Sequence, residues 1–231
     1  RSCYPRPAAG RAVRRRRHAH HDLHVVAAAL HPRRLDAEKA GVAVDERGVI
    51  AVDKQMCTNV PHIFAIGDLV PGPMLAHKGS AEGVMVAERI AGQASTVNYD
   101  TIASVVYTQP EIAWVGKTEQ LLRQTGVDYR AGVFPFAASG RARARRETDG
   151  MVKILSAAET DQVLGVHIIG SAASELVATA VMAMEFDGSS EDIARTVLGQ
   201  RVNDEMAIDD LQRQRTGRQR DGISQDRLVR N

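Results

Sequence analysis

A short stretch, residues 63–77, constrains the fold of this chain more than any other part. Its apolar run Ile63-Phe-Ala-Ile ends in Gly67-Asp68, and Gly72-Pro-Met-Leu-Ala-His77 follows. We predict a buried strand, a tight turn and the start of a helix, which present a carboxylate and a helix N-terminus to one ligand. Gly67 has no Cβ, so the backbone can approach that ligand closely. The Asp68 carboxylate can accept hydrogen bonds from polyol hydroxyls, and the helix start favours an electron-rich ring edge.

A Gly-Asp pair at the end of a strand is also a common turn, so Asp68 has two interpretations. The turn interpretation applies to a lone pair, whereas the surrounding motif favours ligand binding. The side chain of Met74 is predicted to pack rather than to take part in chemistry.

Several short sequence motifs occur in a recognisable order along the chain. Ala65-Ile-Gly-Asp68, Gly72-Pro-Met-Leu-Ala-His-Lys78 and Glu82-Gly83 resemble the second flavin-contacting motif of the FAD-dependent pyridine nucleotide–disulfide oxidoreductases, in their dihydrolipoamide dehydrogenase group. The resemblance continues in strings that start at Pro110, Phe134, Asp149 and Leu164, and it covers about residues 35–198. Each string alone is weak, but their order and spacing together form a strong signal.

This resemblance implies a cofactor and a set of contacts. Asp68 would bind the ribityl part of FAD, and backbone groups of Met74, Leu75, Ala76 and His77 would approach the pyrimidine edge of the flavin. The helix start would stabilise negative charge that develops there on reduction. The parent reaction would oxidise a dihydrolipoyl dithiol through a disulfide and FAD, with NAD as the acceptor. A homodimer and lipoyl domains of 2-oxoacid dehydrogenase complexes are the implied partners.

Parts of the family's chemistry are missing from the 231 residues. The only cysteines are Cys3 and Cys57, so no Cys-x4-Cys redox pair occurs. Val197-Leu-Gly-Gln-Arg201 stands where a His-Pro-Thr segment with a following Glu would supply the acid/base group. The Gly-rich phosphate loops are also absent. We therefore assign no catalytic residue and expect the chain alone to be inactive. Another disulfide or mercuric reductase, or a non-catalytic dimerisation module, are the alternatives.

The predicted fold is an α/β remnant of a flavin-binding domain followed by an α+β dimerisation domain, in which an antiparallel sheet has helices on one face. The boundaries are 1–34 (anomalous, Arg/His-rich), 35–100 (part of the FAD-binding domain), 101–199 (dimerisation domain) and 200–231 (anomalous polar tail). We expect both ends to be irregular. Our hypothesis is that residues 1–34 are translated out of frame or wrongly joined, which resequencing of the coding DNA would test.

In the first domain, residues 36–40 predict a short helical piece, and residues 42–45 and 49–53 predict a hairpin. A helix over residues 78–91 is predicted to place Val84, Ala87, Ile90 and Ala91 on one face and to end at Gly92. The linker is predicted at residues 93–101.

In the second domain, strands are predicted within residues 105–107, 112–115, 129–136, 151–155 and 163–169. Helices are predicted after Thr118, Ser171 and Ser189 or Ser190. Trp114 and Tyr107 are candidates for packing in the core or an interface, and His167 for a hydrogen-bonded core histidine. The arginines at positions 141, 143, 145 and 146 are predicted to lie in a solvated loop.

Composition narrows the partners. The net charge of +2 does not by itself indicate a polyanionic partner, and aromatic residues do not alternate with the arginines, so we expect no nucleic acid. No apolar run reaches the ~20 residues of a membrane span. A cluster at His18, His20, His21 and His24 can bind metal adventitiously, and we assign no metal site. With no close-spaced cysteines, a cytoplasmic location is expected, or the mitochondrial matrix in a eukaryote.

Overall fold

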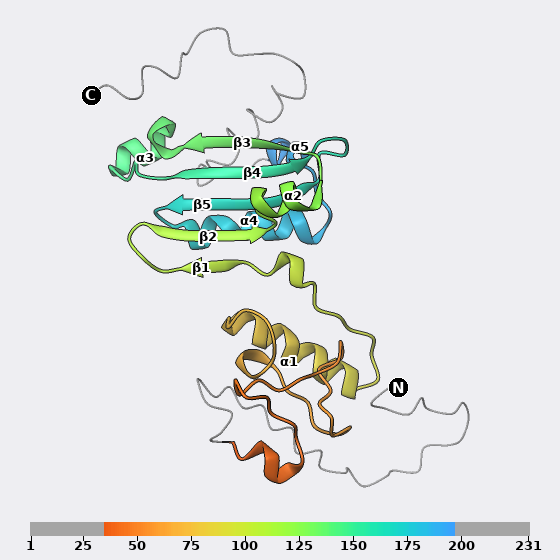
Figure 1. The fold of residues 1–231 in the computed structure, drawn as a ribbon. Coiled ribbons are helices and arrows are strands. Elements are labelled where there is room, and N and C mark those ends of the chain that lie inside the picture. Colours follow the sequence, from red (N-terminus) through yellow and green to blue (C-terminus); the bar gives the residue numbers. More distant parts are fainter. Residues whose placement is uncertain (1–34, 197–231) are drawn as a thin grey trace. The chain divides into compact units, whose positions relative to one another are not determined.

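The computed structural model describes residues 35–196 (Figure 1). The predicted anomalous ends, the histidine cluster and the segment after Thr196 lie outside these residues. The chain divides into two compact units between Val97 and Asn98, and each is described by itself.

Within residues 35–97, the first unit holds two short 3-10 helices and one α-helix. These are η2 (Ala37–Ala40), η3 (Gly67–Leu69) and α1 (Ala76–Ile90). As predicted, η2 ends at Gly41, whose φ of 78° is in the left-handed region that favours glycine. The core lies between α1 and the extended segments around it, and its buried members are Val42, Ile50, Met56, Ala65, Leu69, Val70, Met85 and Val86.

The strands predicted in this unit are largely irregular among the described residues. The expected hairpin is reduced to one bridge, Val44 to Ile50, because the Asp45 carboxylate accepts the N–H groups of Arg47 and Val49. Ile50 donates its N–H to Leu69 instead. The predicted strand at residues 63–66 likewise makes one bridge, Cys57 to Phe64. A regular strand needs a continuous neighbour for its ladder, and these segments have only short ones.

The helix prediction is confirmed in position, but the apolar face that was predicted is only partly buried. Helix α1 buries Lys78, Glu82, Met85 and Val86, which repeat at helical spacing. Ile90 packs against the core, whereas Val84 is 58% exposed and Ala87 is exposed as well. The apolar pattern did not indicate that this helix buries two charged residues.

The second unit contains a five-stranded antiparallel sheet, as predicted. Its strands are β1 (Ser104–Val106), β2 (Glu111–Gly116), β3 (Tyr129–Pro135), β4 (Met151–Ala157) and β5 (Val163–Gly170). They lie in the order β1-β2-β5-β4-β3 (Figure 1). The short 3-10 helix η4 (Tyr99–Thr101) precedes β1 within the predicted linker.

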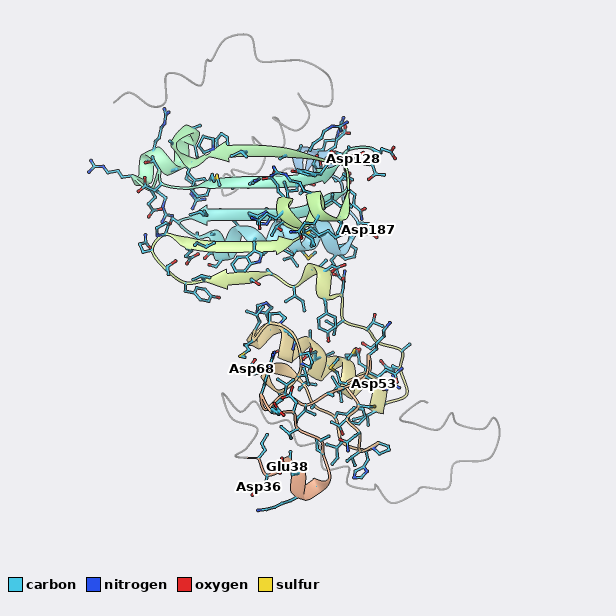
Figure 2. The ribbon with its side chains drawn as sticks, in the orientation of Figure 1. Asp36, Glu38, Asp53, Asp68, Asp128 and Asp187 are labelled. Atoms are coloured by element: carbon cyan, nitrogen blue, oxygen red, sulfur yellow. The ribbon has the colours of Figure 1, made fainter. Side chains whose placement is uncertain are left out.

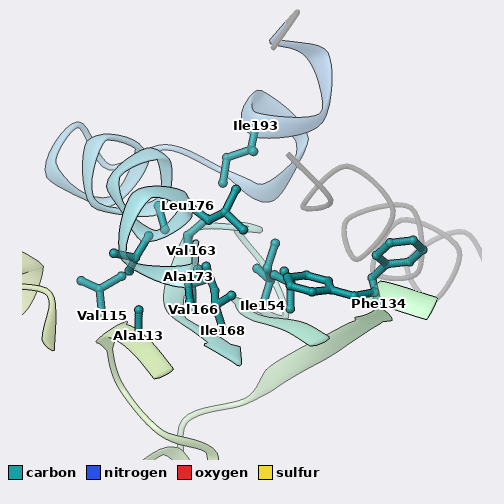
Figure 3. Close-up of a cluster of buried hydrophobic side chains, with 14 of the residues drawn as sticks. Ala113, Val115, Phe134, Ile154, Val163, Val166, Ile168, Ala173, Leu176 and Ile193 are labelled. Atoms are coloured by element: carbon teal, nitrogen blue, oxygen red, sulfur yellow. The ribbon is translucent and has the colours of Figure 1, made fainter. Parts of the chain in front are cut away.

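One face of this sheet carries the core (Figure 3). Ala113, Val115, Ile154, Val166 and Ile168 alternate along their strands and point to this face, as a period of two requires. Helix α4 (Ala173–Glu185) covers them, and α5 (Ser190–Arg195) adds Ile193. The residues of α4 at positions 176, 180, 181 and 184 form an apolar stripe that packs against this core.

Helix α2 (Glu119–Thr125) contacts the opposite face, where its Glu119 carboxylate pairs with Lys153 of β4. Its boundaries follow the sequence closely. The Thr118 hydroxyl accepts the N–H of Leu121, and Gly126 ends the helix with a φ of 67°. Ser189 caps α5 in a reciprocal capping box with Asp192.

Two boundaries differ from the predictions. The residue that precedes α4 is Ala172, at a φ of 60°, rather than Ser171. The arginine-rich segment, predicted as a loop, contains η5 (Phe136–Ala138) and α3 (Gly140–Arg145). The Ser139 hydroxyl caps the N-terminus of α3, and Ala142 is buried in the core. These two interactions stabilise this short helix. The four arginines are exposed, as predicted.

His167 does not have the hydrogen bonds that were predicted for it. It lies on the face of β5 opposite the core, beside Trp114 of β2 and Lys153 of β4 in the strand register. Both ring nitrogens are buried, and neither has a hydrogen-bond partner among the described residues. Trp114 is half-buried, whereas Tyr107 is 80% exposed and so does not belong to the core.

Burial lowers the pKa of His167 below the ordinary value of 6.5, and nearby Lys153 lowers it further, against a smaller opposing effect of Glu119. Below about pH 6.5 the unfolded chain therefore binds a proton at His167 before the folded chain does. We expect the free energy of unfolding of this unit to fall as the pH decreases through that range. Urea titrations that follow Trp114 fluorescence at several pH values from 7.5 to 5 measure this fall.

The His167→Phe variant provides the control for this prediction, because it removes the titrating group and keeps a ring of similar size. Its stability is expected to depend less on pH over the same range. Equal pH dependence in the parent chain and the variant would contradict the assignment to His167.

Candidate functional site

The Gly67-Asp68 turn is held against the first turns of α1. Gly67 has a φ of 67°, a left-handed conformation that favours glycine. A Cβ added to Gly79 would lie 3.2 Å from the Gly67 Cα, so two glycines allow the turn and the helix to approach this closely. Asp68 therefore lies beside the start of α1 (Figure 2).

A buried ion pair connects the helix to this turn. Lys78 Nζ lies 3.0 Å from Glu82 Oε1, and both side chains are fully buried. Lys78 donates to the Gly67 carbonyl oxygen at 3.0 Å, and Glu82 Oε2 accepts the Gly67 N–H at 2.7 Å. Both peptide groups at Gly67 are thus bound by side chains of α1. Lys78 and Glu82 belong to the flavin-contacting motif, but no role was predicted for either residue. Their i, i+4 spacing was the available signal.

The start of α1 is exposed and has no side-chain cap. Leu75, in extended conformation, precedes the helix without capping it, and the first turn contains no acidic residue. Ala76 and His77 are exposed, Leu75 is half-buried, and Met74 is 71% exposed. The first N–H groups of a helix have no partner within it, and they carry the positive end of its dipole. This end therefore suits a ligand edge that is rich in acceptors or negative charge.

Asp68 offers the complementary chemistry a few residues away. Its side chain is exposed, and within residues 35–196 it makes no hydrogen bond or ion pair. An ionised carboxylate only accepts hydrogen bonds, so it suits hydroxyl groups. The structure brings all five predicted residues, Asp68 and 74–77, to one region of the first unit. The exposure of Met74 does not match the packing role that was predicted for its side chain.

Other kinds of site find no support in the described part of the chain. Residues 35–196 contain no cluster of three or more histidine, cysteine or acidic side chains that could bind a metal ion. No helix within this range combines the length and the apolar content that crossing a bilayer requires.

Two family models match the chain. The model described as pyridine nucleotide-disulphide oxidoreductase matches residues 13–83, and the one described as the dimerisation domain of that family matches residues 102–202. Together they span most of the chain. It belongs to the pyridine nucleotide-disulphide oxidoreductase family. The predicted fold class, part of a flavin-binding domain followed by a dimerisation domain, is confirmed. The first match begins at residue 13, so family similarity extends into the segment 1–34 that was predicted to be anomalous.

Two curated relatives that are similar to this chain have the same name. The chain is 55% identical over 161 residues to the dihydrolipoyl dehydrogenase of Cupriavidus necator, a match that covers 70% of this chain and 34% of that protein. It is 50% identical to the mitochondrial dihydrolipoyl dehydrogenase of Sus scrofa, covering 70% of this chain and 32% of the relative. The chain therefore spans about a third of the length of these relatives.

Two solved structures have a similar fold. LpdA from Mycobacterium tuberculosis aligns with a TM-score of 0.71 and 25% identity, over 78% of this chain and 39% of that one. The HOCl-induced flavoprotein disulfide reductase RclA from Escherichia coli aligns with a TM-score of 0.68 and 26% identity, over 81% of this chain and 42% of that one.

Proposed function

We propose that the first unit is part of the FAD site of a dihydrolipoyl dehydrogenase-like flavoprotein. Asp68 accepts hydrogen bonds from ribityl hydroxyls, and the backbone at Met74, Leu75, Ala76 and His77 faces the pyrimidine edge of the flavin. The observation that supports this most directly is the side-by-side placement of an exposed, unpaired carboxylate and an uncapped helix start. The 55% identity to a dihydrolipoyl dehydrogenase supports the same assignment.

The residues present fit this cofactor chemically. Bound FAD supplies two-electron transfer between a dithiol–disulfide couple and NAD. The chain's own residues bind and orient: Asp68 fixes the polyol, and the start of α1 favours negative charge at the ring edge next to it. The glycines at 67 and 79 keep these two groups close together.

Asp68→Ala tests the assignment in a chimera of the Cupriavidus necator enzyme that carries the matching 161 residues of this chain. Such a chimera restores the flanking parts that this chain does not match. We expect it to bind FAD, and Asp68→Ala to weaken binding about 10- to 100-fold, because hydrogen bonds to a charged acceptor contribute roughly 1.5–3 kcal/mol. Flavin fluorescence titration measures the dissociation constants.

Glu38→Ala is the matched control, since Glu38 is an exposed carboxylate of the same unit. It should leave FAD binding unchanged. Equal affinity of the Asp68→Ala and Glu38→Ala chimeras would rule out the proposed ribityl contact.

We further propose that the 231-residue chain does not catalyse the parent reaction alone, because it contains no close-spaced cysteine pair. Purified chain is expected to retain little flavin and to show no NAD reduction with a dihydrolipoyl substrate. Stoichiometric bound FAD after purification would contradict this expectation.

A second candidate function is a non-catalytic dimerisation module, which the match to the dimerisation domain over residues 102–202 favours. Size-exclusion chromatography with light scattering distinguishes it: a flavin-free dimer supports the module, and a monomer at all concentrations argues against it. We also propose that the parent protein forms a homodimer and contacts lipoyl domains. We propose that it is located in the cytoplasm, or in the mitochondrial matrix of a eukaryote. Another disulfide or mercuric reductase is the remaining alternative.

A further inference from the structure

The Lys78–Glu82 pair has a geometry that simple stabilisation of a helix does not require. Most i, i+4 ion pairs lie on the solvent face of a helix, whereas both of these side chains are fully buried. The two carboxylate oxygens of Glu82 face different groups: Oε1 lies beside Lys78 Nζ, and Oε2 accepts the Gly67 N–H. Lys78 reaches the carbonyl oxygen of the same residue. The pair therefore binds the donor and the acceptor of a single glycine.

Stability alone is a poor explanation for such a pair. Removing two charges from water is costly, and apolar residues of similar volume often stabilise a fold as well or better. A buried pair does fix direction, since its hydrogen bonds are satisfied in only one arrangement. Here that arrangement determines the peptide orientation on both sides of Gly67, and Asp68 is the next residue.

The same lysine also lies under the loop that leads to α1. A Cβ added to Gly72 would be 3.0 Å from Lys78 Cε, so the loop packs directly on the lysine stem. Lys78 thereby contacts the turn before Asp68 and the segment before Met74. Both parts of the proposed site rest on one buried side chain.

We propose that Lys78 and Glu82 are a positioning pair, which orients the Gly67 peptide groups and so sets the Asp68 carboxylate relative to the start of α1. This inference rests on the proposed FAD site, and it assigns the pair no contact with the cofactor. It predicts that the pair can be replaced without loss of folding but with loss of this local geometry.

The double variant Lys78→Met/Glu82→Leu of the full chain separates positioning from stability. We expect its thermal unfolding to resemble that of the parent, because both charges are removed together. Amide hydrogen exchange at Gly67, followed by NMR on chain labelled with ¹⁵N-glycine, is expected to become at least about 10-fold faster as its carboxylate acceptor is lost. Protection at Gly165, buried in the other unit, should not change. Unchanged protection of Gly67 would overturn the proposal.

Glu82→Gln serves if the double variant does not fold. Glutamine keeps an acceptor for the Gly67 N–H, but a neutral acceptor forms a weaker hydrogen bond than a carboxylate. We expect faster exchange at Gly67 than in the parent chain, and equal exchange rates would contradict the positioning role.

Titration of the Cupriavidus necator chimera with FAD distinguishes this inference from the proposed function. Weaker binding by the chimeras that carry the double substitution and Asp68→Ala supports the two together. If only Asp68→Ala weakens binding, the positioning role fails and the FAD site stands. If the unsubstituted chimera binds no FAD, the proposed FAD site fails, and the exchange rate at Gly67 decides the positioning role.

Discussion

Gly150→Ala is expected to destabilise the second unit by roughly 3–5 kcal/mol, because it combines a strained backbone with a steric overlap. Gly150 has a φ of 124°, a value that residues other than glycine rarely adopt. A Cβ there would overlap the carbonyl oxygen of Ile169 and lie 3.0 Å from the Gly170 Cα. These are backbone atoms of a central strand, so no side chain can rotate away to relieve the overlap.

Urea unfolding followed by Trp114 fluorescence measures this effect, since Trp114 is the single tryptophan and lies in β2. Gly126→Ala is the matched control. Gly126 also has a left-handed φ, 67°, but nothing lies within 4 Å of an added Cβ. We expect it to cost only about 1–2 kcal/mol. Equal losses at the two glycines would show that the overlap with Ile169 has no effect.

Glu82→Ala is the second large effect, expected to destabilise the first unit by about 3–5 kcal/mol. The substitution leaves the Lys78 ammonium buried without its carboxylate and removes the acceptor of the Gly67 N–H. Hydrogen exchange of peptides from α1, measured by mass spectrometry, reports the stability of this unit separately. Trp114 fluorescence should show the second unit unchanged.

Asp36→Ala provides the comparison with an exposed pair. Asp36 and Lys39 also form an ion pair in the first unit, but their side chains are 59% and 79% exposed. Such pairs contribute ~0–1 kcal/mol. If Glu82→Ala cost no more than Asp36→Ala, the buried pair would not be essential to this unit.

The second unit follows closely from its sequence. Its strands are runs rich in β-branched residues, and alternation places Val152, Ile154, Val166 and Ile168 on one buried face. Helix ends at Thr118 and Gly126 were predictable because hydroxyl caps and left-handed glycines are local devices. Local chemistry decides most of this unit, and its strands find their neighbours within the unit.

The first unit was less predictable, because its structure depends less on local chemistry. The residues of its predicted strands are present, but a ladder depends on continuous neighbours, and the described segments pair at single bridges. The apolar pattern of α1 also gave no indication that Lys78 and Glu82 are buried, because hydrophobic periodicity places charged residues outside. Their partners are the peptide groups of Gly67, and main-chain groups are the same at every residue. No pattern of side chains in the sequence could show that a lysine and a glutamate eleven and fifteen positions later would bind them.

The hydrogen bonds of Lys78 and Glu82 to main-chain atoms also limit which substitutions this segment can accept during evolution. Losing either residue alone leaves an uncompensated charge in the interior, whereas losing both leaves an apolar helix face that can repack. Each single substitution is therefore expected to destabilise the first unit more than the double substitution does. The pair should be inherited or lost as a unit, and a library that varies one position at a time would miss the viable replacements.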